Sequence, residues 1–194
     1  MKNRTLVTLF FLFSILAKAQ EYNANKIVFT DSTNIELLKK NEIYSLNKEE
    51  LYRLISKSKK KYNLLVSFAI WCGPCQESLP LLLKLAEKNK EKLSLYIINI
   101  ENDKSKRLTQ TKKFFNEIKY SNPTFMVSET YGRNSRLKYK NFIKDIIGKK
   151  EFNSSYLGLF ENILFDKNFK ILFKSTYNDN DEVILYNINK IINE

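Results

Sequence analysis

The only two cysteines of this chain lie in one short segment, Trp71-Cys72-Gly73-Pro74-Cys75. Two intervening residues let the sulfurs reach disulfide distance within one helical turn, so the pair can alternate between a dithiol and a small disulfide ring. If a helix begins here, Cys72 lies where unpaired backbone N–H groups and the helix dipole favour a thiolate. Such a position lowers the pKa of a thiol from about 8.5 toward about 7, which makes it a nucleophile near neutral pH. Pro74 suits the first turn, where its missing N–H costs nothing, and Cys75, one turn further in, is then the shielded resolving thiol.

The composition excludes most other catalytic chemistry. The chain has no histidine, which removes Ser-His-Asp and Cys-His nucleophile–base pairs as well as histidine-ligated zinc and haem. Two cysteines cannot complete a four-ligand zinc site or hold an iron–sulfur cluster. None of the four glycines belongs to a phosphate-cradling loop. We therefore expect no metal and no cofactor, which leaves the chemistry that two thiols perform on their own.

A static disulfide is the alternative interpretation of the cysteine pair. A bridge that closes so short a loop removes little entropy from the unfolded chain, so it stabilises the fold only slightly. A chain of 194 residues also buries roughly 70% of its unfolded surface and needs no covalent staple. The spacing therefore favours a redox role over a structural one.

The segments around the pair alternate between strand and helix patterns. Residues 64–70 form a short, almost wholly apolar run directly before the cysteines, which is typical of a strand covered on both faces. Asn47 followed by Glu50 predicts a capped helix start further upstream. The remaining elements are predicted as helices at about 73–89, 104–119 and 137–147, strands at 93–100, 124–127, 162–165 and 170–173, and a last amphipathic helix. This order indicates one α/β domain with a central, partly parallel sheet.

The first 19 residues have the three parts of a secretory signal peptide. Lys2 and Arg4 supply the positive region, residues 6–16 are apolar, and Ala-Lys-Ala at 17–19 gives the small-x-small cleavage pattern. The apolar stretch is shorter than the roughly 20 residues of a membrane span, and an uncleaved anchor is the alternative. We expect a mature domain over residues 20–194, exported to the periplasm or cell envelope and without a membrane span.

The positive charge of the chain does not point to nucleic acid. Loss of the signal peptide lowers the formal net charge from +12 to +9. The lysines are scattered along the chain apart from a cluster at residues 57–61, and no arginine-rich stripe interleaves with aromatic residues. This distribution predicts a solvated lysine-rich surface and no nucleic-acid partner. The acidic residues Asp179, Asp181 and Glu182 are interpreted as a capping cluster at the last helix.

A strand, the Trp-Cys-Gly-Pro-Cys segment and a helix, in this order, resemble the thioredoxin superfamily. The signal peptide and the additional elements are similar to its exported TlpA/ResA-like branch, of the kind seen in Bacteroidetes, over about residues 47–194. The resemblance implies a thioredoxin-like fold: a central mixed sheet flanked by helices, with an N-terminal extension and a TlpA/ResA-type insertion. It also implies that Cys72 is the nucleophile and Cys75 the resolving cysteine, supported by Trp71, Gly73 and Pro74.

Proton transfer is where the chain departs from this family. Thioredoxins often bury a carboxylate in the strand before the motif, whereas residues 65–68 contain none. ResA-like proteins place a glutamate three residues after the second cysteine, where this chain has Ser78. Glu77 is one position away and hence about 100° around the helix. Proton transfer at Cys75 is expected to rely on water or on Glu77.

A second family feature, a cis-proline loop that faces the disulfide and binds the substrate backbone, can be placed in two registers. In the first, Pro123 belongs to this loop, because Pro-Thr before an apolar strand is its usual form. In the second, which we favour, Pro123 begins the extra strand of the insertion, and the terminal hairpin begins at Asn162. Phe160 then falls at the cis-proline position, and a cis bond there is disfavoured by about 3 kcal/mol.

These features predict an exported thiol–disulfide oxidoreductase that reduces protein disulfides through its Cys-x-x-Cys dithiol. The resemblance implies protein substrates with disulfides and a membrane or envelope thiol donor, and we expect a monomer. One alternative is a disulfide oxidase or isomerase. The other is a thioredoxin-fold binding module whose thiols turn over weakly.

Overall fold

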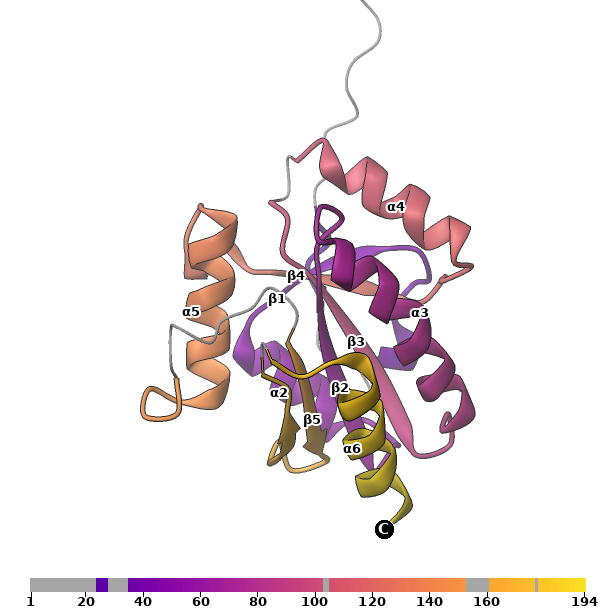
Figure 1. The fold of residues 1–194 in the computed structure, drawn as a ribbon. Coiled ribbons are helices and arrows are strands. Elements are labelled where there is room, and N and C mark those ends of the chain that lie inside the picture. The colour runs from indigo at the N-terminus through magenta and orange to yellow at the C-terminus, as the bar shows by residue number, and fades with distance from the viewer. Residues whose placement is uncertain (1–23, 28–34, 103–104, 153–160, 177) are drawn as a thin grey trace, which may run out of the picture.

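A mixed β-sheet forms the centre of the computed structural model, which describes residues 24–27, 35–102, 105–152, 161–176 and 178–194 (Figure 1). The predicted signal peptide at residues 1–19 lies outside the described residues. Within them, six strands lie in the order β1-β4-β3-β2-β5-β6. Their bounds are β1 Ile43–Leu46, β2 Tyr62–Phe68, β3 Leu93–Asn99, β4 Thr124–Val127, β5 Asn162–Asp166 and β6 Ile171–Lys174. The first four strands run parallel, whereas β5 is antiparallel to β2 and β6 to β5, which confirms the predicted central mixed sheet.

Helices cover both faces of this sheet (Figure 1). Their bounds are α2 Lys48–Ser56, α3 Gly73–Lys88, α4 Arg107–Glu117, α5 Ser135–Ile147 and α6 Asp181–Asn193, with short 3-10 turns η1 Ile35–Leu37 and η2 Glu129–Tyr131. One core lies between the sheet and α2 with α5, and a second lies between the sheet and α3 with α6. Across the described segments, no helix is both long and apolar enough for a membrane span.

The apolar sequence of β2 is explained by the position of this strand between the two cores. Every residue from Tyr62 to Phe68 is buried. Leu65 faces the core under α2 and α5, while Leu64 and Val66 face the core under α3 and α6. A central strand with helices on both faces needs apolar side chains on both, so the alternation typical of half-exposed strands is absent.

Local sequence signals set several of the element boundaries. The reciprocal capping box is present, since Glu50 N–H donates to Asn47 Oδ1 at 2.9 Å and Asn47 N–H donates to Glu50 Oε2 at 2.8 Å. The predicted hairpin is confirmed as β5 and β6, and Asp166 Oδ1 accepts hydrogen bonds from the N–H groups of Asn168 and Lys170 in its turn. Strand β2 ends two residues earlier than predicted, because the Ala69 carbonyl accepts from Cys72 N–H at 3.0 Å and turns the chain toward α3.

Candidate active site

Cys72 lies at the junction of the central strand and its following helix. It is the N-cap residue of α3, and its Sγ accepts a hydrogen bond from the Cys75 N–H at 3.3 Å. The first N–H groups of a helix have no intrahelical acceptor, so a sulfur at this position receives their partial positive charge. Pro74 lies within the first turn, as expected from its missing N–H. This position stabilises a thiolate on Cys72 once the disulfide is opened.

The two cysteines form a disulfide, and they differ in exposure. Their Cα atoms are 5.2 Å apart. Cys72 is half-buried, whereas the Cys75 side chain has no exposed surface and belongs to the core under α3 and α6. The surface of the protein therefore gives an incoming sulfur access to Cys72 but not to Cys75.

The residues on either side of Cys72 are exposed. Trp71 is 46% exposed, and Gly73 and Pro74 are exposed beside it. A Cβ at Gly73 would meet no atom within 4 Å, so this side of the disulfide is free for a bound chain. The guanidinium carbon of Arg107 lies 6.0 Å from the centre of the Trp71 ring, close enough for a cation–π contact. The side chain of Gln76 donates a hydrogen bond to the Ile70 carbonyl at 2.6 Å and so connects the two ends of the segment that carries the cysteines.

A carboxylate from the C-terminal helix reaches the turn that follows Cys75. Ser78 is buried, and its hydroxyl donates a hydrogen bond to Oδ1 of Asp181, the first residue of α6. Glu77, the residue expected from sequence to move protons, is exposed. The side chain of Asn180, not an acid, caps α6 by accepting from Val183 N–H at 3.0 Å. The sequence predicted Asp181 only as part of a capping cluster. The one signal of its contact with α3 is Ser78, a polar residue among the apolar positions of that helix.

A second carboxylate, Glu161, is buried on the opposite face of the sheet. It directly precedes β5, and its carbonyl accepts from Ser67 N–H of β2 at 3.0 Å. Its carboxylate accepts from the Tyr139 hydroxyl at 3.4 Å, and that hydroxyl is also hydrogen-bonded to the Ser67 hydroxyl. Burial raises the pKa of Glu161 to about 7, although Lys174 acts in the opposite direction. Glu161 is not predictable from the sequence, because nothing near it in the sequence indicates that α5 covers it.

The structure separates Pro123 from the disulfide. Pro123 directly precedes β4, which runs parallel to β3 and lies two strands from β2. It therefore lies at the amino end of its strand, while Cys72 follows the carboxyl end of β2. Phe160, the residue of the other register, lies outside the described residues, and its role remains a prediction.

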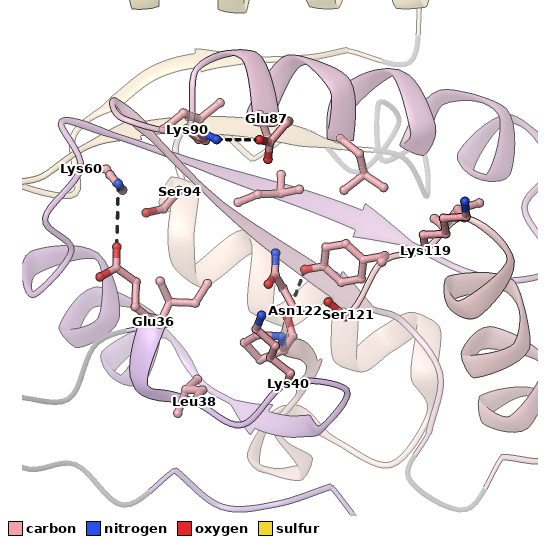
Figure 2. A pocket seen from close by; sticks show the side chains of 18 residues that line it. Glu36, Leu38, Lys40, Lys60, Glu87, Lys90, Ser94, Lys119, Ser121 and Asn122 are labelled. Atoms are coloured by element: carbon pink, nitrogen blue, oxygen red, sulfur yellow. Dashed lines mark hydrogen bonds and ion pairs between the residues drawn. The ribbon is translucent and has the colours of Figure 1, made fainter.

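A cavity of about 400 Å³ lies at the amino ends of β3 and β4, away from the disulfide (Figure 2). Four lysines line it, of which Lys60 pairs with Glu36 at 3.9 Å and Lys90 with Glu87 at 3.0 Å. Of the residues expected at the active site, Pro123 alone lines this cavity. Size alone would make the cavity a candidate site, but the thiol chemistry lies on the open surface at the N-terminus of α3.

Comparisons with known proteins agree with this geometry. The sequence model of the Thioredoxin family matches residues 42–145, slightly more than half of the chain. A search among curated proteins found no significant match.

Similar solved structures include the thioredoxin domain of a thiol-disulfide oxidoreductase from Bacteroides vulgatus, with 20% identity over 69% of this chain and 81% of that chain, and a TM-score of 0.46. A thioredoxin-related protein from Neisseria meningitidis serogroup B has 18% identity over 70% of this chain and 85% of that chain, with a TM-score of 0.48. A thiol-disulfide oxidoreductase from Bacteroides fragilis has 20% identity over 68% of this chain and 81% of that chain, with a TM-score of 0.44.

The family model covers β1 through most of α5, and so includes the strand, the cysteine pair and the helix that follows it. Its match confirms the resemblance seen in the sequence, and with it the prediction of an oxidoreductase. The chain belongs to the thioredoxin family and is a thiol–disulfide oxidoreductase.

Proposed function

We propose that this protein is exported to the periplasm or cell envelope and there reduces disulfide bonds of protein substrates. The observation that carries the proposal is the unequal exposure of the two cysteines, with Cys72 half-buried at the N-terminus of α3 and Cys75 fully buried behind it. The sequence of residues 1–19, with its positive, apolar and small-x-small parts, supports export.

The reaction consists of two exchanges. The Cys72 thiolate attacks one sulfur of the substrate disulfide, which forms a mixed disulfide and releases the other substrate sulfur as a thiolate. Cys75 then attacks Cys72 Sγ, which restores the Cys72–Cys75 disulfide and releases the substrate as a dithiol. Two electrons pass from the protein to the substrate, so a membrane or envelope thiol donor must return them before the next turnover.

The surface around Cys72 suits an extended polypeptide as substrate. Trp71, Gly73 and Pro74 present an exposed, uncharged surface on one side of the disulfide. Glu161, which directly precedes β5, lies near the carboxyl end of β2, since its carbonyl accepts from Ser67 N–H. This hydrogen bond supports the register in which Phe160 belongs to the substrate loop.

The direction of electron flow can be tested by redox equilibrium. The Gly-Pro pair between the cysteines is the one found in strongly reducing thioredoxins, which have potentials near −270 mV. We expect the disulfide of the purified mature protein to equilibrate with glutathione at a potential below about −200 mV and the protein to reduce insulin. A Cys72→Ser variant is the control and should be inactive. A potential above about −180 mV, in the range of disulfide isomerases, would exclude the reductase and support the oxidase or isomerase alternative.

A further inference from the structure

The resolving step of the exchange needs an acceptor for the proton of the Cys75 thiol, and the positions that supply one in related proteins carry no acid in this chain. Cys75 is fully buried, and a thiol attacks a disulfide only after it loses its proton. The chain has no histidine, and residues 65–68 of the preceding strand carry no acid. The acceptor must therefore be a carboxylate outside this strand or a water molecule.

A residue on the same helix face as Cys75 is hydrogen-bonded to the carboxylate of Asp181. Ser78 lies three residues after Cys75, and residues at this spacing are neighbours on a helix surface. Ser78 is 4% exposed, and its hydroxyl donates to Asp181 Oδ1. Asp181 comes from α6, which packs on α3 over the core that contains Cys75. Because Asn180 already caps α6, the helix does not need the Asp181 side chain as its cap.

We propose that Asp181 accepts the proton of the Cys75 thiol during resolution, and that Ser78, three residues after Cys75 on α3, is the positioning residue that holds this carboxylate. In this step the Cys75 S–H bond breaks, its proton passes to Asp181, and a new bond forms between Cys75 Sγ and Cys72 Sγ. The bond between Cys72 Sγ and the substrate sulfur breaks, and the substrate leaves as a thiolate. The inference rests on the proposed exchange reaction but does not depend on its direction.

Other charged groups around the site are less suited to this role. Glu77 of α3 and Glu182 of α6 are exposed, and the Asp179 carboxylate accepts from Thr176 N–H at 2.6 Å. Glu161 directly precedes β5 and the nearby Lys174 ends β6, and the Glu161 carboxylate contacts Tyr139 on the face covered by α5. Arg107 of α4 lies 6.0 Å from the centre of the Trp71 ring. Glu101, which follows β3, is buried, but its carboxylate pairs with Arg107 at 3.9 Å and accepts from the Ser105 hydroxyl at 3.1 Å.

The test isolates the resolving step by mixing the reduced protein with Ellman's reagent in a stopped-flow instrument. The first thionitrobenzoate is released when Cys72 attacks, at a rate proportional to reagent concentration. The second is released when Cys75 resolves the mixed disulfide, at a rate independent of that concentration. Asp181→Asn keeps an acceptor oxygen for Ser78, so we expect the fold to persist, and Ser78→Ala is the second variant. Glu182→Gln removes an exposed carboxylate from the same helical turn and serves as the matched control.

We expect Asp181→Asn to slow the second phase about tenfold or more between pH 6 and 7, with recovery above about pH 9, where hydroxide removes the proton. Ser78→Ala should slow the same phase by less, and Glu182→Gln should change neither phase. Equal second-phase rates in Asp181→Asn and Glu182→Gln would overturn the proposal, as would a slowing of the same size at every pH, which indicates a structural role. A slowing in Glu77→Gln instead would assign the proton to Glu77. Because the reagent needs no protein substrate, failure to reduce insulin would contradict the proposed function without affecting this result.

Discussion

Cys72 and Cys75 differ at the scale of single residues in the property that exchange requires: one sulfur can be reached from outside and the other cannot. A Cys75→Ser variant therefore forms the mixed disulfide but lacks the thiol that resolves it. We expect it to accumulate covalent adducts with envelope proteins, visible as bands on non-reducing gels that disappear with reductant.

The matched control for this trapping experiment is Cys72→Ser, which should give no adducts, because the remaining Cys75 is buried. Mass spectrometry of the bands would identify the substrates. If Cys75→Ser traps nothing and the wild-type protein does not reduce insulin, the chain is better described as a thioredoxin-fold binding module.

The raised pKa of Glu161 leads to a separate prediction about the pH dependence of stability. Burial raises its pKa in the folded protein to about 7, from an ordinary value of 4.5. The stabilisation from its bound proton is fully present below about pH 4.5 and is lost as the pH rises through about 7. Glu161→Gln carries no charge, so we expect it to increase the free energy of unfolding at pH 8 by up to about 3 kcal/mol relative to wild type.

Urea denaturation of both proteins at pH 4.5 and pH 8 measures this effect, and the difference between the two proteins removes the contribution of other carboxylates. The gain should be small at pH 4.5, where Glu161 is protonated in both the folded and the unfolded chain. An equal difference at both pH values would show that the substitution acts through packing and not through the charge.

The thiol pair could be identified from sequence because its chemistry depends on adjacent residues. A strand, Cys-x-x-Cys and a helix start are all local, and the disulfide, the N-cap sulfur and the buried Cys75 follow from them. Asp181 and Glu161 are different, because Asp181 meets Ser78 across 103 positions of sequence and Glu161 meets Tyr139 across 22. Their roles depend on which helix packs where, which no local pattern specifies.

At the scale of elements, the same distinction between local and distant contacts separates what was predicted from what was not. The capping box at Asn47 and the turn at Asp166 each satisfy backbone N–H groups within a few residues, and both were predicted. Helix α4 ends at Glu117, shortly before the end predicted from its apolar spacing, and Lys119 takes a left-handed conformation with φ of 57° just beyond it. A helix boundary set by one backbone conformation is not visible in the hydrophobic period.

Strand order shows the limit of the local patterns more clearly. The brief strand β4 was predicted correctly, but its place between β1 and β3 depends on hydrogen bonds to strands that are distant in the sequence. The order matters for function, because it places Pro123 two strands from β2, whereas β5 pairs directly with β2 and approaches the cysteines. The sequence left both registers of the substrate loop open because it does not encode this order locally.

At the scale of the whole molecule, the direction of electron flow is linked to stability, because folding and disulfide formation form one thermodynamic cycle. A strong oxidant has a dithiol form that is more stable than its disulfide form, and a reductant has the opposite order. A potential difference of 30 mV corresponds to about 1.4 kcal/mol for this two-electron couple. If the protein reduces its substrates, the disulfide form should therefore unfold at a higher urea concentration than the dithiol form.

The comparison requires urea denaturation of the mature protein with and without an excess of reductant, followed by fluorescence of Trp71, the only tryptophan, and by far-UV circular dichroism. Two probes are needed because Trp71 adjoins the disulfide, which can alter its fluorescence without any unfolding. A double Cys72→Ser, Cys75→Ser variant is the control, and its transition should be unaffected by reductant. A dithiol form more stable than the disulfide form would assign the molecule to the oxidases, because folding would then favour the reduced state of the cysteine pair.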